Sequence, residues 1–267
     1  MSAPMRLGLA LLLAIVLAVT AGPWLSPHAP DAIDFSAEWG GPPTLADGHW
    51  FGTDSLGRDV LARTLAGGRL SLLLGFAATL VSVVIGVACG AIAGYVGGRV
   101  DQWMMRLVDV LYALPFMFVV IVLMVVFGRH PLLLFVAVGA VNWLDMARIV
   151  RGQTLALRER GFVLAARLAG AGPWAIVRRH VLPNLLSPVV VCATLTVPQA
   201  ILAESFLSFL GLGVQEPAAS WGVLISDGAR DMELTPWALA FPALFLVLTL
   251  LALQLLGEGL RAAQARG

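Results

Sequence analysis

The sequence holds few side chains that could carry out chemistry, and their spacing fits no familiar catalytic site. The chain has four histidines, at His28, His49, His130 and His180. They stand too far apart for the HExxH spacing of a zinc hydrolase, and no serine lies in a GxSxG sequence. All 17 basic residues are arginines, whereas a nucleotide-binding P-loop or a Schiff base requires a lysine. We therefore predict no catalytic or metal site, and no cofactor in this chain.

The composition is that of a membrane protein. Of the 267 residues, 59% are hydrophobic and only 12% are charged, whereas soluble domains carry roughly 25% charged residues. The 17 basic and 16 acidic side chains cannot cover the water-facing surface of a chain this long. Cys89 and Cys192 lie inside apolar runs, where we expect buried thiols. The net charge of +1 gives no reason to expect a nucleic acid as a partner.

Intervals without formal charge mark six candidate membrane spans, because a helix needs about 20 mainly apolar residues to cross the hydrocarbon core. The intervals are residues 7–30, 70–98, 110–128, 131–144, 181–203 and 234–257. The fourth is short, and it becomes long enough if Asp145 and Arg148 pair on one helical face near the interface. We therefore expect an all-α integral membrane protein with about six transmembrane helices.

The arginines orient these spans, because short cytoplasmic loops carry an excess of Arg and Lys. With the N-terminus inside, the cytoplasmic set is Arg6, Arg99, Arg106, Arg148, Arg151, Arg158, Arg160, Arg167, Arg178, Arg179, Arg261 and Arg266. The outer set is smaller, with Arg58, Arg63, Arg69, Arg129 and Arg230. We therefore place the N-terminus in the cytoplasm. The first span also fits a cleaved signal peptide, whose removal would leave five spans with the same sidedness.

Residues 26–69 form a long segment outside the membrane. Its first part is a loop rich in Pro, Gly and Asp. Apolar residues then recur at helical spacing, at Val60, Leu61 and Leu65. This pattern predicts an amphipathic helix on the outer interface before the second span. The spacing alone does not distinguish a surface anchor from a functional element.

The cytoplasmic segment 151–187 predicts two short helices. Residues 162–169 form the first, and Gly170 supplies the left-handed residue that commonly ends a helix. Pro173 begins the second, where its missing N–H costs nothing, and this helix ends near Pro183. Small residues at the centre of the pair offer a close-approach surface for another protein. Folding back onto the bundle, or contact of Arg178 and Arg179 with anionic lipid, fits the sequence equally well.

Several of these residues resemble the EAA loop of binding-protein-dependent ABC importer permeases, whose pattern is Glu-Ala-Ala, a short spacer, Gly, and an apolar-Leu-Pro ending. The matching residues are Leu164, Ala165, Ala166, Gly170, Val181, Leu182 and Pro183. The segments FGTDSLGRDVLAR, ESFLSFLGLGVQEPAASWG and LLALQLLGEGLRAA resemble the subgroup that imports dipeptides, oligopeptides and nickel. The resemblance extends from His49 to Arg261 and is greatest to the second permease of oligopeptide systems.

The resemblance implies half of a transporter in the bacterial inner (plasma) membrane. Its partners would be a homologous second permease, an external solute-binding protein and two cytoplasmic ABC ATPases that bind ATP and magnesium. It implies a peptide cargo, with nickel or another small solute as the alternative within the same subgroup. An ion-coupled secondary transporter is disfavoured, because neither Asp145 nor Glu204 has the midplane position of a coupling-ion site.

The resemblance also implies that the loop between the fourth and fifth spans docks on the ATPase. The docking residues would be Leu164, Ala165, Ala166, Gly170, Trp174, Leu182 and Pro183. Leu164 stands where the family usually has glutamate, so a charged contact is lost or is supplied by Glu159 or the nearby arginines.

One acidic residue, Glu204, lies in the outer half of the fifth span. With Ser205 and Ser208 it could line the translocation path, pair with an arginine of a partner subunit, or hold the bundle together. By family analogy, the loop that contains Trp221 would form an external gate or a dock for the binding protein. Each of these roles remains open at the level of sequence.

We divide the chain into three parts on this basis. Residues 1–70 hold the first transmembrane helix, the external loop and the interfacial helix. Residues 71–260 form the core permease domain of five transmembrane helices with its coupling loop 151–187, and residues 261–267 are a short cytoplasmic tail.

Overall fold

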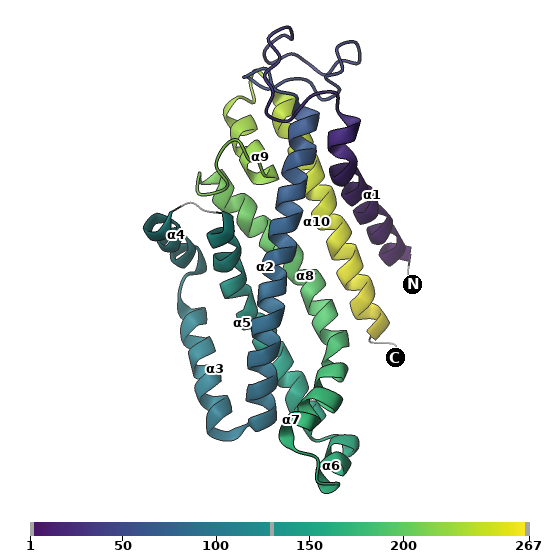
Figure 1. Ribbon diagram of the computed structural model, residues 1–267, viewed down its shortest axis with the longest axis vertical. Helices are drawn as coiled ribbons and strands as arrows, with labels where there is room; N and C mark the ends of the chain where they lie inside the picture. The colour runs from purple at the N-terminus through teal and green to yellow at the C-terminus, as the bar shows by residue number, and fades with distance from the viewer. Residues whose placement is uncertain (1–2, 129–130, 265–267) are drawn as a thin grey trace.

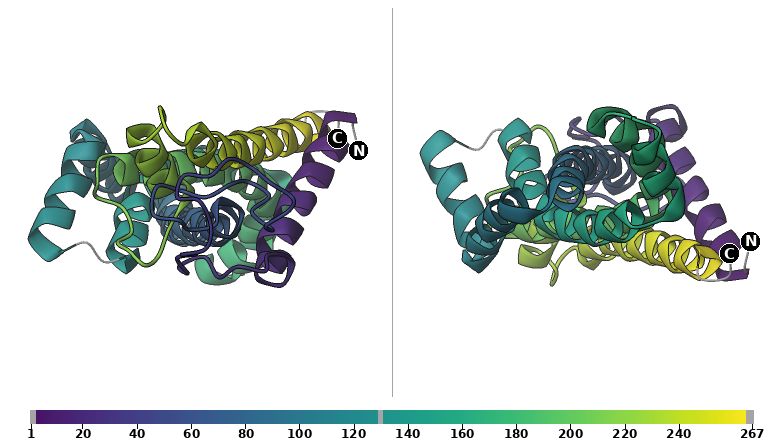
Figure 2. Two further views of the ribbon diagram at one scale, coloured as in Figure 1. Left: turned by 90° about the horizontal axis from the view of Figure 1, so that it is seen from above. Right: turned by 90° about the horizontal axis from the view of Figure 1, so that it is seen from below.

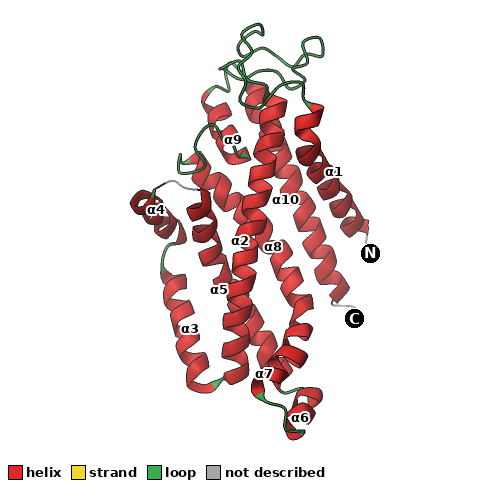
Figure 3. Cartoon of the chain, viewed as in Figure 1, coloured by secondary structure: helices red, strands yellow, loops and turns green. Residues whose placement is uncertain are grey.

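The computed structural model describes residues 3–128 and 131–264, and these residues form a bundle of helices without a β-sheet (Figures 1 and 3). The elements are α1 (Ala3–Leu25), α2 (Val60–Val96), α3 (Gly98–Ala113), α4 (Phe116–Phe127), α5 (Pro131–Arg158), α6 (Gly161–Leu168), α7 (Pro173–Ile176), the π-helical segment η1 (Val177–Val181), α8 (Leu182–Phe209), α9 (Trp221–Arg230) and α10 (Pro236–Gln264). Arg129, His130 and Arg266, with the end of the predicted tail 261–267, lie outside the described residues.

Two regions that the sequence singles out lie at opposite ends of the bundle (Figure 1). The loop 26–59 covers the upper end beside α9 and the start of α10, and we call this the loop end. Helices α6 and α7 lie at the lower end, which we call the hairpin end. Figure 2 shows the loop over the middle of the bundle, with α1 on one side and α3 and α4 on the other. The arrangement agrees with the predicted placement of residues 26–69 and 151–187 on opposite sides.

Four helical stretches among the described residues are long and apolar enough to cross a membrane. They are residues 3–22 of α1, all of α2, the continuous stretch Pro173–Phe209, and α10. A fifth is added if α3 and α4 together count as one bent span. The fourth predicted span, residues 131–144, lies in α5, which also carries Asp145 and Arg148 and is not among these stretches. The structure therefore confirms a helical membrane protein with four or five such spans.

The predicted span at residues 110–128 is wrong as a single straight helix. The axes of α3 and α4 differ by 81°, and the break falls at Leu114 and Pro115, which both have extended backbone. A residue before proline is disfavoured in the helical region, because the proline ring clashes with its backbone. The apolar run is therefore divided between two helices of different direction.

The predicted interfacial helix at residues 60–65 is also wrong as a separate element. These residues are the first turns of α2, which continues without a break for 37 residues. Asp59 caps this helix by accepting a hydrogen bond from the Ala62 backbone N–H at 2.6 Å. Leu61 and Leu65 are buried in a core with α1, α8 and α10, so they do not face lipid. The boundary that we placed at residue 70 falls inside this helix.

Helix α2 packs very closely on α5 along a row of glycines. A methyl group at Gly86 would lie 2.5 Å from the Cβ atom of Met146, and one at Gly90 would lie 2.4 Å from the backbone oxygen of Ala147. A methyl group at Gly94 would lie 2.7 Å from the Cβ atom of Thr154. In a bilayer, where apolar burial does not drive helices together, such small residues allow the close contact that holds two helices.

The predicted pairing of Asp145 with Arg148 does not form. Arg148 instead donates from Nη2 to Oδ1 of Asp109 on α3 at 2.8 Å. Its guanidinium also lies 4.3 Å from the ring centroid of Tyr112. One turn further along α5, Arg151 forms an ion pair with Asp101. These arginines therefore fasten α3 to α5, which a rule based on neighbours along one helix cannot predict.

Replacing Gly90 by alanine should destabilise the bundle. The new methyl group would overlap the Ala147 carbonyl of α5, and we expect the free energy of unfolding to fall by about 1–3 kcal/mol. The measurement is thermal unfolding of the detergent-solubilised protein, with Gly152→Ala on α5 as the matched control. Gly152 has no neighbouring atom within 4 Å, so its replacement should leave stability unchanged or raise it by up to about 1 kcal/mol. Equal behaviour of the two variants would contradict the packing argument.

Candidate functional site

The hairpin end contains the two short helices that the sequence predicts. Helix α6 ends in a Schellman motif, in which the Ala171 N–H donates to the Ala166 oxygen and the Gly170 N–H to the Arg167 oxygen, both at 3.1 Å. Gly170 has the predicted left-handed conformation, with φ of 81°. Pro173 lies in the first turn of α7, as expected. The turn is therefore fixed by the local residues that made it predictable.

One face of this helix pair is anchored in the bundle, and the other is open. Val163, Ile176 and Val181 are buried in one apolar cluster with residues of α2, α5 and α8. In contrast, Leu168 is 90% exposed and Trp174 is 70% exposed. Of the residues that the resemblance implied, Leu164, Ala165, Gly170, Trp174 and Pro183 are exposed, and Ala166 and Leu182 are half-buried. The hairpin end therefore presents apolar side chains that the described chain leaves uncovered.

The second helix does not stop near Pro183, contrary to the prediction. Helix α7 passes into the π-helical segment η1 and then directly into α8, with Leu182 helical at the junction. Pro183 lies in the first turn of α8. Proline has no backbone N–H to donate. The preceding segment is π-helical, with hydrogen bonds between residues five apart and not four, so Pro183 does not interrupt a regular α-helical ladder there. The hairpin end and the membrane helix α8 are therefore one continuous helical stretch.

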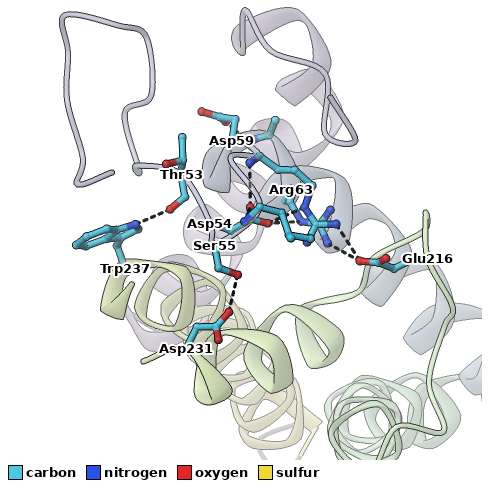
Figure 4. Close-up of polar contacts among 11 residues, drawn as sticks. Thr53, Asp54, Ser55, Asp59, Arg63, Glu216, Asp231 and Trp237 are labelled. Atoms are coloured by element: carbon cyan, nitrogen blue, oxygen red, sulfur yellow. Dashed lines mark hydrogen bonds and ion pairs between the residues drawn. The ribbon is translucent and has the colours of Figure 1, made fainter. Parts of the chain in front are cut away.

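The loop end carries a cluster of charged side chains that joins segments far apart in the sequence (Figure 4). Arg58 donates from Nε to Asp54 Oδ2 at 2.7 Å and from Nη1 to Glu216 Oε1 at 2.8 Å. Ser55 donates to Asp231 Oδ2 at 2.6 Å. Arg63, which the sequence places among the outer arginines, is 3% exposed. The cluster therefore connects the loop 26–59 to the segments on both sides of α9.

The surroundings of Arg58 and Glu216 favour the charged form of both side chains. Burial opposes the charge of Arg58, but its contacts with Glu216 and Asp54 outweigh burial and raise the pKa of Arg58. The same hydrogen bond from Arg58 holds the pKa of Glu216 below its usual range. Burial has the opposite effect on Asp227, whose pKa is raised. Arg58 and Glu216 therefore form a lasting ion pair near neutral pH.

These residues border a cleft of about 520 Å³ at the loop end. Its lining includes the cations Arg58 and Arg230 and the anions Glu216, Asp227 and Asp231. The cleft can therefore offer partners of both signs to a ligand that carries two opposite charges.

Glu204 lies beneath the loop end, at the contact of α8 with α2 and α9. Its side chain is 1% exposed and accepts a hydrogen bond from Ser208 Oγ at 2.7 Å. On the other side, Ser71 Oγ lies 3.5 Å from Glu204 and accepts from the Trp221 backbone N–H at 3.0 Å. Ser205 is also buried, and its hydroxyl has no partner among the described residues. In this arrangement Glu204 lies buried between three helices.

Trp221 fills the space between these helices. It is 0% exposed, and its indole N–H donates to the Thr64 oxygen at 2.9 Å. A methyl group at Gly68 of α2 would lie 2.6 Å from the Trp221 ring, so the helix can approach only because this residue is glycine. Trp221 therefore anchors the predicted gate loop to α2.

The sequence analysis missed two sets of residues at the loop end. The first is the cluster of Arg58 and Arg63 with Glu216, which lies more than 150 positions further along the chain. The second is a group of His28, Asp34 and His49 within the loop. A concentration of His and Asp in one short loop was the only available signal, because the histidines follow no metal-binding motif.

Comparison with known proteins gives a consistent result. Residues 86–267 match the family described as "Binding-protein-dependent transport system inner membrane component". The oligopeptide transport system permease protein OppC of Escherichia coli (strain K12) is 54% identical over 96% of this chain and 84% of its own length. The protein of the same name from Haemophilus influenzae is 51% identical over 93% of this chain and 80% of its own length. The dipeptide transport system permease protein DppC of Bacillus subtilis (strain 168) is 48% identical over 96% and 79%.

Replacing Glu204 by leucine should destabilise the contact of α8 with α2 and α9. The change leaves the hydroxyls of Ser208 and Ser71 without their buried acceptor, which costs about 1–3 kcal/mol of the free energy of unfolding. Glu204→Gln keeps an acceptor oxygen and should cost clearly less. Both variants are measured by thermal unfolding in detergent.

The matched control for this substitution is Glu258→Leu, because Glu258 is an exposed glutamate on α10. It should change stability little. A smaller loss in Glu204→Leu than in the control would show that Glu204 does not hold the helices. If Glu204 instead lines the translocation path, Glu204→Gln changes uptake while the assembly is preserved.

Proposed function

Because the chain belongs to the family of binding-protein-dependent transport system inner membrane components, we propose that it is a permease subunit of an ATP-driven peptide importer. It forms half of a translocation pathway across the bacterial inner membrane. The observation that carries this function is that two different surfaces lie at opposite ends of the bundle. A cleft with charges of both signs lies at the loop end, and an uncovered apolar surface lies at the hairpin end.

The cargo is a di- or oligopeptide delivered by an external solute-binding protein. The relatives are named for oligopeptide and dipeptide transport, and the family is named for dependence on a binding protein. A peptide carries an ammonium and a carboxylate at its two ends. The lining of the 520 Å³ cleft, with Arg230 beside Asp227 and Asp231, offers a partner for each. This charge pattern supports a peptide over nickel, which would use only the anionic partners.

The hairpin end is the coupling surface for a cytoplasmic ATPase. Leu168 and Trp174 are exposed by 90% and 70%, and water is a poor environment for such large apolar side chains. Leu164, in the position of the family's glutamate, is 43% exposed. Its apolar side chain supports docking that depends on hydrophobic contact more than on an ion pair.

Movement of the hairpin end is transmitted through α8. The stretch from Pro173 to Phe209 is continuous, and Glu204 near its far end bonds to Ser208 while it contacts Ser71 of α2. A displacement at α7 is therefore carried to the contact with α9 and the gate loop. ATP favours the closed form of the ATPase, and the coupled helices follow by a shift between two states.

Nucleotide binding belongs to partner chains. The sequence contains no lysine, and the phosphate loop of an ATPase requires one. The resemblance to ABC importer permeases implies an assembly with two cytoplasmic ATPases, which bind ATP and magnesium, together with a second homologous permease. This chain contributes no catalytic group to ATP hydrolysis.

The permease crosses the membrane six times, with the N-terminus in the cytoplasm. The span missing from the four or five is α5, which packs along α2 from Gly86 to Gly94. Two of its internal charges have protein partners, since Arg148 pairs with Asp109 and Arg151 with Asp101. Paired charges of this kind support a span that a count of apolar residues does not recognise.

Replacing Leu168 by aspartate should abolish association with the ATPases. Leu168 is 90% exposed, so the change places a charge on the docking surface without disturbing the core. We expect at least about a tenfold loss of affinity, the equivalent of about 1.4 kcal/mol, measured by co-purification in detergent. Leu168 is a better test than Gly170, whose positive φ means that any side chain strains the turn.

The matched control for the docking test is Leu45→Asp, because Leu45 is 85% exposed in the loop 26–59. It should leave ATPase association unchanged. Association that survives Leu168→Asp, or that is lost equally in both variants, would remove the support for this docking surface.

Uptake by the reconstituted transporter should depend on ATP and select peptides. With the second permease, the ATPases and the binding protein in liposomes, we expect a labelled tripeptide to accumulate only when ATP is present on the cytoplasmic side. Leu168→Asp should abolish this accumulation, and Ni²⁺ should not be taken up. ATP-independent accumulation driven by an ion gradient would contradict the importer, and uptake of Ni²⁺ alone would contradict the peptide cargo.

A further inference from the structure

Three side chains with metal-binding atoms come together in the loop 26–59. His28, Asp34 and His49 each offer one ligand atom, and these atoms all lie within 4.8 Å of one another. The residues come from three separate stretches of the loop, so the fold brings them together and no local motif does. The proposed transport function assigns no role to them.

The orientation of His49 is fixed by Asp59. Oδ2 of Asp59 lies 2.8 Å from Nδ1 of His49, and both side chains are almost fully buried, at 1% and 3% exposed. Asp59 accepts the proton of Nδ1, which leaves Nε2 of His49 as the nitrogen with a free lone pair. A carboxylate behind a histidine in this way is the usual outer partner of a metal-binding imidazole.

The free nitrogen of His49 faces the other two candidate ligands. Nε2 lies 3.4 Å from Oδ2 of Asp34 and is buried without a hydrogen-bond partner among the described residues. Nε2 of His28 is buried in the same way. Two buried imidazole nitrogens without partners are costly unless something binds them.

Asp34 is held in place by Ser36. One of its oxygens, Oδ1, accepts hydrogen bonds from the hydroxyl of Ser36 at 2.5 Å and from the Ser36 backbone N–H at 2.8 Å. The other oxygen, Oδ2, takes no part in these bonds and faces Nε2 of His49.

The donor set indicates which class of cation fits. Two imidazole nitrogens with one carboxylate suit zinc and related late first-row ions, whereas calcium and magnesium prefer oxygen ligands alone. In a tetrahedral zinc site with bonds of about 2.0–2.1 Å, neighbouring ligand atoms lie about 3.4 Å apart. Asp34 Oδ2 lies 3.4 Å from His49 Nε2, which matches this distance between neighbouring ligands.

We propose that His28, Asp34 and His49 form a zinc site at the loop end, with a fourth position left for water or another ligand. The rings of His28 and His49 are stacked, with centroids 4.1 Å apart and planes 14° apart. Binding requires the His28 ring to tilt out of this stack so that its nitrogen points at the same ion, and it has room to do so because it is half-buried and Gly48 beside it has no side chain.

The site fastens the loop to the membrane helices. Asp59 holds His49 through Oδ2 and caps α2 through Oδ1, which accepts from the Ala62 N–H. A zinc ion on His49 therefore links His28, near the end of α1, to the first turn of α2. The loop that covers the cleft would be ordered by the metal and loosened without it.

The test measures zinc on the full chain in lipid nanodiscs, without the ATPases, so its outcome is independent of the transport proposal. The protein is stripped with EDTA, exposed to zinc chloride and desalted, and bound zinc is measured by mass spectrometry. We expect equimolar zinc in the wild type and a thermal stabilisation by zinc. His28→Gln should reduce the affinity by about tenfold or more, as losses around metal sites do, and Asp34→Asn should do the same.

Two controls make the outcome decisive. His180→Gln removes a histidine at the hairpin end and should bind zinc like the wild type, and calcium chloride should not replace zinc. Neither His28→Gln nor Asp34→Asn breaks the bond between His49 and Asp59, so their thermal unfolding without zinc should match the wild type. Absence of zinc in the wild type would overturn the site. Equal zinc in wild type and variants, or equal binding of calcium, would also overturn it.

Discussion

The structure depends on the direct contact of α2 with α5. Along this contact the two backbones approach so closely that Gly86 and Gly90 cannot carry even a methyl group. Helices in a bilayer gain little from burying apolar surface, so close packing of this kind decides which helices stay together. Because α2 begins at Asp59 in the loop end and ends beside Arg158 near the hairpin end, it also sets the distance between the two functional surfaces.

Helix α8 packs on this frame through apolar side chains and a small number of polar contacts. Val197 and Ile201 of α8 share an apolar cluster with Leu72 of α2, and a methyl group at Gly75 would lie 2.5 Å from Ile201. The polar contacts join Glu204 and Ser208 of α8 to Ser71 of α2, which also accepts from the first residue of α9. Such polar contacts between membrane helices are individually modest, at about 1 kcal/mol, so close apolar packing supplies much of what holds α8 in place.

The features that the sequence predicts correctly are the local ones. Gly170 and Pro173 fix the turn between α6 and α7 through backbone preferences that do not depend on the rest of the fold. The charge-free intervals likewise locate the long apolar helices. Several errors arise where a distant residue decides the outcome, as when Arg148 binds Asp109 on α3 and not Asp145 on its own helix. The burial of Arg63 and the grouping of His28, Asp34 and His49 have the same origin, because loop geometry and not spacing brings these side chains together.

The π-helical segment η1 has a consequence for how this protein tolerates changes in chain length. A π-turn holds one residue more than the corresponding α-turn, and each residue of an α-helix advances the next by about 100° around the axis. Because η1 already holds the extra residue within its own turn, deleting a single residue between Val177 and Val181 restores a regular α-helix and leaves α6 and α7 facing nearly the same way relative to α8. The same deletion in the regular α-helical part of α8 would turn Leu168 and Trp174 by about 100° around the helix axis. The η1 segment is therefore the place in this stretch where the chain can lose a residue without redirecting the hairpin end.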